Sequence, residues 1–492
     1  MKRIVKLGKR AFAALVLCAA TAITLPAQTF TTLHRFDGPD GAVPQTSLIQ
    51  ATDGNLYGTT AGGGAYSAGT IFKITPTGTA TTLYSFCSQV IGQFCADGGN
   101  PYGALVEATN GDFYGTTFTG GAANAGTVFT ITPGGTLTTL YSFCTLWQNS
   151  CPDGGAAYAG LVQAPNGDFY GATTFGGANG SGTVFKITPS GTLTTLCSFD
   201  ADGNWDGFAP RGALVQAADG DFYGTTPVGG ANCPPYGCGT VFKVTPGGTL
   251  TTLYSFEGTD GAYPYAALFQ ITDGDLYGTT GAGGAGNLGT VFKITPSGTL
   301  TTLHSFDGTD GAEPQAALVQ AAGGDFYGTT WVGGAANDGT VFTITPSGTL
   351  RTLHSFCFPS AECTSGAGNP IGGLVQATNG DFYGTAEYGG LIPCDEHGGA
   401  LGCGTIFSLF AGLGPFVETH TTVGKVGAAV NILGTNLTGA TSVSFNGTAA
   451  AFTVASPSLI TTTVPAGATT GKVMVETPSG TISSKVSFRV LP

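Results

Sequence analysis

The sequence predicts an all-β protein, and three observations lead to this prediction. The motif GDFYGTT at residues 111–117 returns in variants along the chain. Each copy lies among short segments rich in Val, Ile, Phe, Tyr and Thr, which Gly, Pro, Asn and Asp separate. The motif tyrosines are spaced 50–57 residues apart, which is typical of a repeat architecture; they are Tyr57, Tyr114, Tyr170, Tyr223, Tyr277, Tyr327 and Tyr383.

Residues 1–28 have the layout of a secretory signal peptide. Five basic residues precede Ala11, and an uncharged run rich in Ala, Leu and Val extends to Leu25. The run is too short to favour a membrane span. We therefore expect cleavage near Ala27 or Gln28 and a secreted mature chain that is not an integral membrane protein. We expect it outside the cell or at the cell surface, with the periplasm and an uncleaved anchor as alternatives.

The mature chain is strongly acidic. Removing five of the 16 Lys and Arg leaves 11 against 29 Asp and Glu, a net charge of −18. A chain this poor in cations is a bad candidate for binding phosphate backbones, so we expect no nucleic-acid partner.

Each repeat contains four strand-like segments. In the unit around residue 277 they span residues 266–272, 275–280, 289–295 and 299–306. A dipeptide such as Asn110-Gly111 separates the first two segments in all seven units and predicts a type I′ hairpin. A Thr-Pro-x-Gly turn joins the third and fourth segments in six units.

The seventh unit lacks its fourth segment. It stops after residues 404–410, whereas the mature N-terminus begins with an unmatched fourth segment at residues 29–36. Closing a ring with the N-terminal strand completes the last unit and removes both exposed edges. The sequence therefore predicts a seven-bladed β-propeller over residues 29–411, with an open solenoid as the alternative.

The GDFYGTT motif itself is predicted to be scaffold. Its Phe and Tyr point to opposite faces of the blade, and the glycine after them permits close packing. An aromatic ligand platform is the alternative, but aromatic side chains repeated at strand spacing usually pack against one another.

The repeats resemble the GloVer tandem-repeat family of exported bacterial proteins. The residues that carry the resemblance are the pattern GGxxxxGTVFKITPSGTLTTLYSF and the following GxxPxxxLVQAxDGxFYGTT, over about residues 29–410. The resemblance implies an exported repeat protein of propeller type with no established activity.

Residues 415–492 resemble an IPT/TIG domain, an immunoglobulin-like β-sandwich. The matching stretches are residues 434–437, 443–447 and 464–467, ending at Phe488. Short alternating strands with turn signals every eight to twelve residues also favour a small sandwich. Such domains are usually spacers or protein-contact modules.

Ten cysteines form close pairs within single inter-strand loops. In an oxidising compartment we expect five local disulfides, which are Cys87–Cys95, Cys144–Cys151, Cys233–Cys238, Cys357–Cys363 and Cys394–Cys403. A metal site is the weaker alternative, because no pair has C-x-x-C spacing. Cys197 is left as a buried free thiol.

All five pairs are expected on one face of the ring, together with most of the length variation. Insertions in repeat proteins often mark the binding face. The candidate ligand-binding residues there are Trp147, Trp205, Trp331 and Asp206, because exposed tryptophans stack on sugar rings. A calcium site is a further hypothesis, with Asp200, Asp202 and Asp206 as ligands; no other cofactor is expected.

No catalytic constellation is present in the sequence. G-x-S-x-G, zinc and P-loop signatures are missing, and His34, His304 and His354 occupy a strand-four position that other units fill with tyrosine. We therefore expect an exported, non-enzymatic binding or surface-structural protein that presents a disulfide-pinned acidic loop face to an extracellular glycan or protein. The alternative is an extracellular carbohydrate-active hydrolase or lyase with acidic residues on that face.

Overall fold

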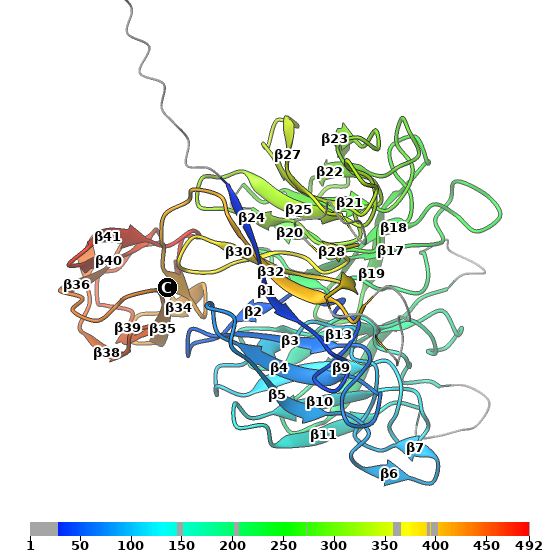
Figure 1. Ribbon diagram of the computed structural model, residues 1–492, viewed down its shortest axis with the longest axis horizontal. Helices are drawn as coiled ribbons and strands as arrows, with labels where there is room; N and C mark the ends of the chain where they lie inside the picture. Colours follow the sequence, from blue (N-terminus) through cyan, green and yellow to red (C-terminus); the bar gives the residue numbers. More distant parts are fainter. Residues whose placement is uncertain are drawn as a thin grey trace, which may run out of the picture.

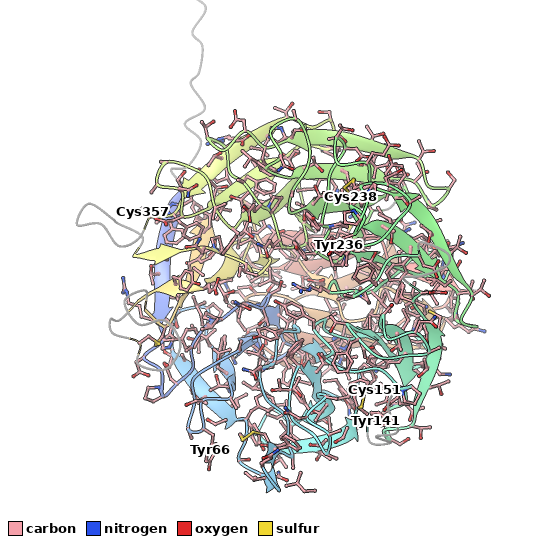
Figure 2. All side chains as sticks on the ribbon, turned by 90° about the vertical axis from the view of Figure 1, so that its right-hand side faces the viewer. Tyr66, Tyr141, Cys151, Tyr236, Cys238 and Cys357 are labelled. Carbon is pink, nitrogen blue, oxygen red and sulfur yellow. A yellow bond between two sulfur atoms is a disulfide. The ribbon has the colours of Figure 1, made fainter. Side chains whose placement is uncertain are left out.

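The repeat region folds into four-stranded antiparallel sheets that resemble propeller blades. A computed structural model describes residues 28–144, 151–200, 206–271, 273–357, 366–390, 394 and 402–491. These residues form strands and no helix, and therefore none that is long and apolar enough to cross a membrane. In Figure 2 the sheets follow one another in chain order around a common centre. The predicted all-β class is confirmed.

Seven such sheets occur in the described part of the repeat region. Blades 1 to 3 consist of β2 (Ile49–Gln50), β3 (Leu56–Thr60), β4 (Thr70–Ile74) and β5 (Ala80–Ser85); β8 (Val106–Glu107), β9 (Phe113–Thr117), β10 (Thr127–Ile131) and β11 (Leu137–Ser142); and β12 (Val162–Gln163), β13 (Phe169–Thr173), β14 (Thr183–Ile187) and β15 (Leu193–Ser198).

Blades 4 to 6 repeat the same order. They consist of β16 (Val215–Gln216), β17 (Phe222–Thr226), β18 (Thr240–Val244) and β19 (Leu250–Ser255); β20 (Phe269–Gln270), β21 (Leu276–Thr280), β22 (Thr290–Ile294) and β23 (Leu300–Ser305); and β24 (Val319–Gln320), β25 (Phe326–Thr330), β26 (Thr340–Ile344) and β27 (Leu350–Ser355).

Blade 7 combines the two ends of the repeat region. Its strands are β29 (Val375–Gln376), β30 (Phe382–Ala386), β32 (Thr405–Phe410) and the N-terminal β1 (Thr29–Arg35), in the order β1-β32-β30-β29. β1 pairs antiparallel with β32, with Thr29 opposite Phe410 and Arg35 opposite Thr405. The N-terminal strand β1 is therefore the fourth strand of this sheet.

Repeated aromatic side chains pack the blades against one another. The phenylalanine that follows each fourth strand contacts the strand-three phenylalanine of the next blade edge-to-face, at centroid distances of 5.0–5.4 Å. The pairs are Phe86–Phe129, Phe143–Phe185, Phe199–Phe242, Phe256–Phe292, Phe306–Phe342, Phe356–Phe407 and Phe36–Phe72.

The motif tyrosines add a second contact between blades. All seven are buried, and the ring of Tyr170, for example, stacks on Phe222 of blade 4 at 4.0 Å. The glycine after each tyrosine is required by packing: a Cβ at Gly115 would lie 2.5 Å from the ring of Phe129. The scaffold interpretation of GDFYGTT is therefore confirmed.

The hairpins between first and second strands differ from the predicted type I′ turn. Only the glycine has a left-handed φ, such as +84° at Gly54, and Asp53 does not. The Gly54 N–H donates to the Ala51 carbonyl, and the Ala51 N–H donates to the Asn55 carbonyl. This is a type I turn followed by a glycine bulge. An Asp53 carboxylate oxygen accepts from the Asn55 N–H and favours this turn.

The first strand of each blade is shorter than predicted. In blade 5 only Phe269–Gln270 pairs with β21, whereas residues 266–272 were expected to form the strand. The Ala266 carbonyl instead accepts a hydrogen bond from Thr225 Oγ1 of blade 4. The segment just before β20, which we call the inner segment of the blade, is therefore hydrogen-bonded to the preceding blade and not to β21 of its own blade.

The C-terminal domain is the predicted two-sheet sandwich. One sheet contains β33 (Glu418–Thr419), β35 (Ala429–Leu433), β39 (Leu459–Thr463) and β38 (Phe452–Ser456). The other contains β37 (Thr448–Ala449), β36 (Ser442–Phe445), β40 (Val473–Thr477) and β41 (Gly480–Ser483), and β34 (Val423–Lys425) pairs in parallel with β42 (Arg489–Leu491). One buried core fills the space between them, with Ile432, Val443, Phe445, Ile460, Val473 and Phe488.

The sandwich packs on the hairpin face of the repeat region, which we define as the turns between first and second strands (residues 51–55, 108–112, 164–168, 217–221, 271–275, 321–325 and 377–381). It reaches four blades through the pairs Ser458–Thr52, His420–Glu107, Arg489–Ala218 and Thr435–Thr378. In Figure 1 it lies on the side opposite β6 (Val90–Ile91) and β7 (Phe94–Cys95). The domain thus lies against the hairpin face at four blades.

Glu107 marks a departure from the repeat at this contact. Six blades have glutamine at this position, and the Gln50 side chain accepts from the Thr378 N–H of blade 7. Glu107 accepts the equivalent bond from the Thr52 N–H, but its second neighbour is His420 at 4.0 Å. Burial raises the pKa of the Glu107 carboxyl.

Candidate functional site

The opposite face carries the non-repeating loops, and we call it the loop face. It comprises the connections from second to third strands (residues 61–69, 118–126, 174–182, 227–239, 281–289, 331–339 and 387–404) and from fourth strands to the next blade (36–48, 86–105, 143–161, 199–214, 256–268, 306–318 and 356–374). Loops here vary in length, whereas the hairpin turns do not.

Local disulfides hold several of these loops. The structure contains Cys87–Cys95, Cys144–Cys151, Cys233–Cys238 and Cys394–Cys403, as predicted. Cys357 is also disulfide-bonded, and its expected partner Cys363 lies outside the described residues. Cys197 is a free, half-buried thiol, and burial raises its pKa to about 11.

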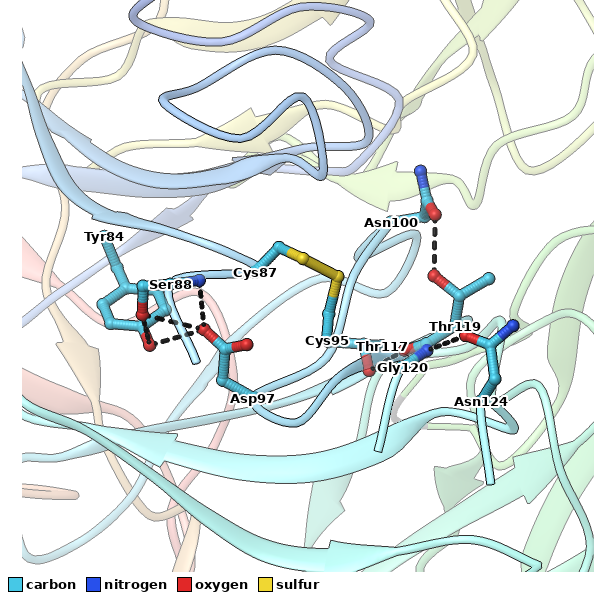
Figure 3. The surroundings of a disulfide bond; sticks show 10 residues. All are labelled: Tyr84, Cys87, Ser88, Cys95, Asp97, Asn100, Thr117, Thr119, Gly120 and Asn124. Carbon is cyan, nitrogen blue, oxygen red and sulfur yellow. Dashed lines mark hydrogen bonds between the residues drawn. A yellow bond between two sulfur atoms is a disulfide. The ribbon is translucent and has the colours of Figure 1, made fainter. Parts of the chain in front are cut away.

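The first of these loops shows how an aspartate supports the disulfide (Figure 3). An Asp97 carboxylate oxygen accepts from the Tyr84 hydroxyl at 2.7 Å and from the Ser88 N–H at 3.0 Å. In the next loop Asp153 accepts from the Tyr141 hydroxyl and the Cys144 N–H. Each carboxylate joins the end of the fourth strand to the start of the loop.

The FDGTDGA loops use the same arrangement without a disulfide. Asp40 and Asp310 contact His34 and His304 at 2.7 Å, and each accepts from a loop N–H three residues earlier. Asp260 accepts from the Tyr254 hydroxyl and the Glu257 N–H. The recurring aspartates and strand-four histidines are therefore structural partners.

The calcium hypothesis stays a prediction. Asp202 lies outside the described residues. Asp206 is half-buried, and burial, followed by the nearby charge of Asp200, raises the pKa of its carboxyl. In the part of the chain that the structure describes, no group of three or more His, Cys, Asp or Glu side chains could hold a metal ion.

Of the three candidate tryptophans, Trp147 and Trp205 lie outside the described residues. Trp331 directly follows β25 and is half-buried, not exposed as expected. The exposed apolar side chains of this face are others. They are Tyr66, Val90, Ile91, Phe175, Tyr236 and Tyr263.

Tyr236 is the most exposed of them at 70 %. It belongs to the loop Cys-Pro-Pro-Tyr-Gly-Cys, closed by the Cys233–Cys238 disulfide. Its carbonyl accepts from the Gly229 N–H, and the Gly237 N–H donates to the Cys233 carbonyl. The backbone under this ring is thus fixed, while the ring itself faces solvent (Figure 2).

Four side chains from consecutive blades form what we call the central arc: Tyr102, Tyr158, Arg211 and Tyr265. Tyr102 and Tyr158 stack at 4.7 Å with an interplanar angle of 12°. The Arg211 guanidinium carbon lies 5.3 Å from the Tyr158 ring centre and 5.4 Å from that of Tyr265. The arrangement is an unbroken row of flat surfaces with one cation in it.

A buried carboxyl and a tryptophan lie beside the arc. Glu387 is 8 % exposed, and one of its carboxylate oxygens accepts from Gln45 Nε2 at 3.0 Å. Burial raises the pKa of Glu387. Its charge contributes to the raised pKa values of Tyr102 and Tyr158, after burial as the main cause. Side chains of blades 2, 3 and 7 therefore converge.

The Glu387 carboxyl and the Trp331 indole are neighbours at this place. Glu387 Oε2 and Trp331 Nε1 are buried, and neither makes a hydrogen bond of normal geometry to a described residue. Hydrogen bonding to Gln45, Tyr388 and Trp331 nevertheless lowers the pKa that burial raises in Glu387. The carboxyl is therefore surrounded by three polar side chains of the protein itself.

The sequence contained a signal for the central arc that the analysis of motifs missed. Aligning the repeats on the segment before each first strand puts one variable residue at the same position in every blade. These residues are Gln45, Tyr102, Tyr158, Arg211, Tyr265, Gln315 and Ile371, between a preceding proline or alanine and a leucine three positions later. Variation at a fixed position of a repeat, at the inner edge of each blade, indicates a shared lining.

Comparison with protein-family models matches the Gloeobacter/Verrucomicrobia repeat at residues 19–155 and 144–324, and the IPT/TIG domain at residues 415–490. These matches confirm both predicted resemblances. No curated protein matches this chain.

Among solved structures, a fungal alcohol oxidase of the AA5 family in complex with copper is similar in fold. It has 14 % sequence identity and a TM-score of 0.52, and the match covers 94 % of this chain and 99 % of that one. A putative 6-phosphogluconolactonase from Bacteroides fragilis matches with 16 % identity, a TM-score of 0.42, and coverage of 74 % and 99 %. A gluconolactonase from Xanthomonas campestris matches with 14 % identity, a TM-score of 0.38, and coverage of 64 % and 90 %.

Proposed function

We propose that this chain, which belongs to the Gloeobacter/Verrucomicrobia repeat family, is an exported, non-enzymatic binding protein whose loop face holds an extracellular glycan or protein. One observation carries the proposal. The side chains that repeat are used in packing, whereas the variable side chains of the inner segments meet in the central arc beside Glu387 and Trp331. The ligand site is therefore the middle of the loop face.

The scaffold in this proposal is a seven-bladed propeller closed by β1. Its closure is supported by the contact between Phe36, which follows β1, and Phe72 of blade 1. The six remaining pairs of consecutive blades have the same phenylalanine contact. The Gly373 N–H of blade 7 also donates to Ser47 Oγ, and Thr385 Oγ1 donates to the Thr46 carbonyl. The Thr385 bond repeats one that Thr116, Thr225, Thr279 and Thr329 make to the inner segment of the next blade, which supports closure.

Export is supported by the cysteines and by the N-terminal sequence. Four disulfides between described residues suggest an oxidising, non-cytoplasmic location. The basic and then apolar stretch before Gln28 has the layout of a signal peptide.

The C-terminal sandwich supports the choice of face. It contacts four blades on the hairpin face, so that face is already occupied within the chain. The loop face carries exposed Tyr66 and Tyr236, and large exposed apolar side chains gather at interaction sites.

Glu387 favours a second candidate, an extracellular carbohydrate-active hydrolase or lyase. A buried carboxyl whose pKa is raised by desolvation is suited to act as a general acid. Such an enzyme needs a second carboxylate, about 5–10 Å away, and Glu313 is close enough to Tyr265 for its charge to raise the pKa of that tyrosine, after burial as the main cause.

A glycan array combined with a polysaccharide hydrolysis screen tests both candidates on the mature protein. The binding proposal expects retained glycans and no released sugar. Turnover that Glu387→Gln abolishes and Asp338→Asn leaves intact contradicts the binding proposal and supports the enzyme. An array without any retained glycan, together with no protein captured from the surface of the source cells, contradicts the binding proposal. The absence of released sugar in the hydrolysis screen contradicts the enzyme.

A further inference from the structure

Arg211 is the only lysine or arginine within the connections that define the loop face, and Arg35, at the end of β1, lies against Gly366 and Gly390 of these connections. The connections that define this face contain 17 Asp and Glu against this single cation. Elsewhere in the ring, cations lie beside acids: Lys186, Lys243 and Lys293 pair with Asp168, Asp221 and Asp275 on the hairpin side. A cation at the centre of an acidic face therefore needs a separate explanation.

The contacts of Arg211 are with tyrosine rings, and not with the acidic side chains of the loop face. Its guanidinium lies over the rings of Tyr158 and Tyr265, and no ion pair joins it to any described residue. Stacking on aromatic rings covers the faces of a guanidinium and leaves its N–H edge for planar, bidentate acceptors. The side chain as a whole is exposed, so that edge can be reached from solvent.

We propose that Arg211 binds the carboxylate of a terminal acidic sugar on an otherwise neutral glycan; this rests on the proposed function of the loop face. Guanidinium and carboxylate form two parallel charge-assisted hydrogen bonds. The neighbouring Tyr158 and Tyr102 stack on each other, and Arg211 lies over Tyr158, so what these tyrosines offer a pyranose is their hydroxyl groups.

The acidic surroundings limit the ligand to one charge. A polyanion would bring its other carboxylates near acidic side chains such as Glu313, whose charge acts on Tyr265 of the arc. At physiological ionic strength charges within about 8 Å still repel each other. A neutral chain with a single acidic end avoids this repulsion and uses the cation of the arc.

The buried atoms beside the arc suit the rest of such a sugar. The Glu387 carboxyl has the polar groups of Gln45, Tyr388 and Trp331 around it, and they lower the pKa that burial raises. Sugar hydroxyls both donate and accept, so a ring held by Arg211 can join this polar group. An acidic peptide has no comparable hydroxyls, which favours the glycan.

Calorimetric titration of the mature protein with three probes tests the proposal. The probes are a glucuronyl-terminated oligosaccharide, the same oligosaccharide ended by glucose, and oligogalacturonate. We expect the glucuronyl probe to bind about 10- to 100-fold more tightly than the glucosyl one, which is the range of one charge-assisted pair, and to bind more tightly than oligogalacturonate.

Three variants distinguish binding by the Arg211 guanidinium from an effect of the protein's net charge. Arg211→Gln is expected to remove the preference for the glucuronyl probe, and Arg211→Lys to restore little of it, because a single ammonium lacks the fork. Arg351→Gln, which makes the same charge change on the exposed edge of β27, is expected to leave binding intact.

Equal binding of the glucuronyl and glucosyl probes overturns the assignment of Arg211 but leaves the proposed function standing. Tighter binding of oligogalacturonate overturns the limit to one charge. If no probe binds and the array retains no glycan, the inference fails together with glycan binding.

Discussion

Replacing Phe36 with alanine tests whether β1 closes the ring. Phe36 follows β1, is 1 % exposed, and contacts Phe72 at 5.3 Å with an interplanar angle of 65°. Phe306, which follows β23, is also 1 % exposed and contacts Phe342 at 5.4 Å and 68°. The two residues occupy the same position in different blades, so Phe306→Ala is a matched control.

The expected cost is the same for both variants. Truncating a buried, well-packed phenylalanine to alanine lowers the free energy of unfolding by about 3–5 kcal/mol. The unfolding entropy is about 2 cal/mol/K per residue, so for a repeat region of roughly 380 residues the free energy of unfolding falls by about 0.8 kcal/mol per kelvin near Tm. A loss of about 4 kcal/mol therefore lowers Tm by about 5 °C.

Differential scanning calorimetry of the two variants measures this cost. Closed packing predicts that Tm falls by similar amounts, within about 2 °C of each other at the sensitivity estimated above. If Phe36→Ala leaves Tm unchanged while Phe306→Ala lowers it, β1 does not carry a blade junction, and the ring account is refuted.

Three further predictions follow from buried or bonded groups. Burial lowers the pKa of His354 to about 4, below the 6.5 of an exposed histidine. Between these pH values the unfolded chain binds one more proton than the folded chain, so stability should fall as pH drops from about 6.5 to 4. His354→Phe should flatten this dependence of Tm on pH in thermal melts. Replacing both Cys233 and Cys238 with serine should cost about 2 kcal/mol by loop entropy, read from denaturant midpoints, and an unchanged midpoint contradicts it. Glu107→Gln removes the charge facing His420, so limited proteolysis should release the C-terminal domain faster than from the wild type, and equal rates would show that the other contacts suffice.

The strands could be predicted because the same sequence pattern occurs in all seven repeats. In the unit of blade 5 the second, third and fourth strands were expected at residues 275–280, 289–295 and 299–306, and they occupy Leu276–Thr280, Thr290–Ile294 and Leu300–Ser305. Local disulfides were predictable for the same reason, because each pair is close in sequence and lies in one loop.

Other features depended on contacts between blades. The first strand is short because Thr225 takes the Ala266 carbonyl across a blade boundary, and single-repeat periodicity contains no such information. The turn type was missed because Asp53 bonds the Asn55 N–H with its side chain. The aspartate loops suggested metal ligands, but Asp260 already bonds Tyr254 and the Glu257 N–H.

The candidate site was the least predictable part. Tyr158 and Arg211 are 53 residues apart, and nothing in either neighbourhood marks them as contacts. The tryptophans were chosen for their residue type, yet Trp331 is half-buried, and the most exposed aromatic side chain among the described residues is Tyr236. Recognising the site required the positions of equivalent residues around a common centre.

The most direct test of the central claim compares two tyrosines of the same blade. Tyr170 is a repeated residue, 4 % exposed and stacked on Phe222, and Tyr158 is a variable residue of the central arc. Binding to the array glycans and Tm are measured for Tyr170→Ala and Tyr158→Ala. The account predicts that Tyr170→Ala lowers Tm by about 5 °C and still binds below that temperature, whereas Tyr158→Ala loses binding with a much smaller change in Tm. Loss of binding in Tyr170→Ala at unchanged Tm, with normal binding in Tyr158→Ala, would contradict it.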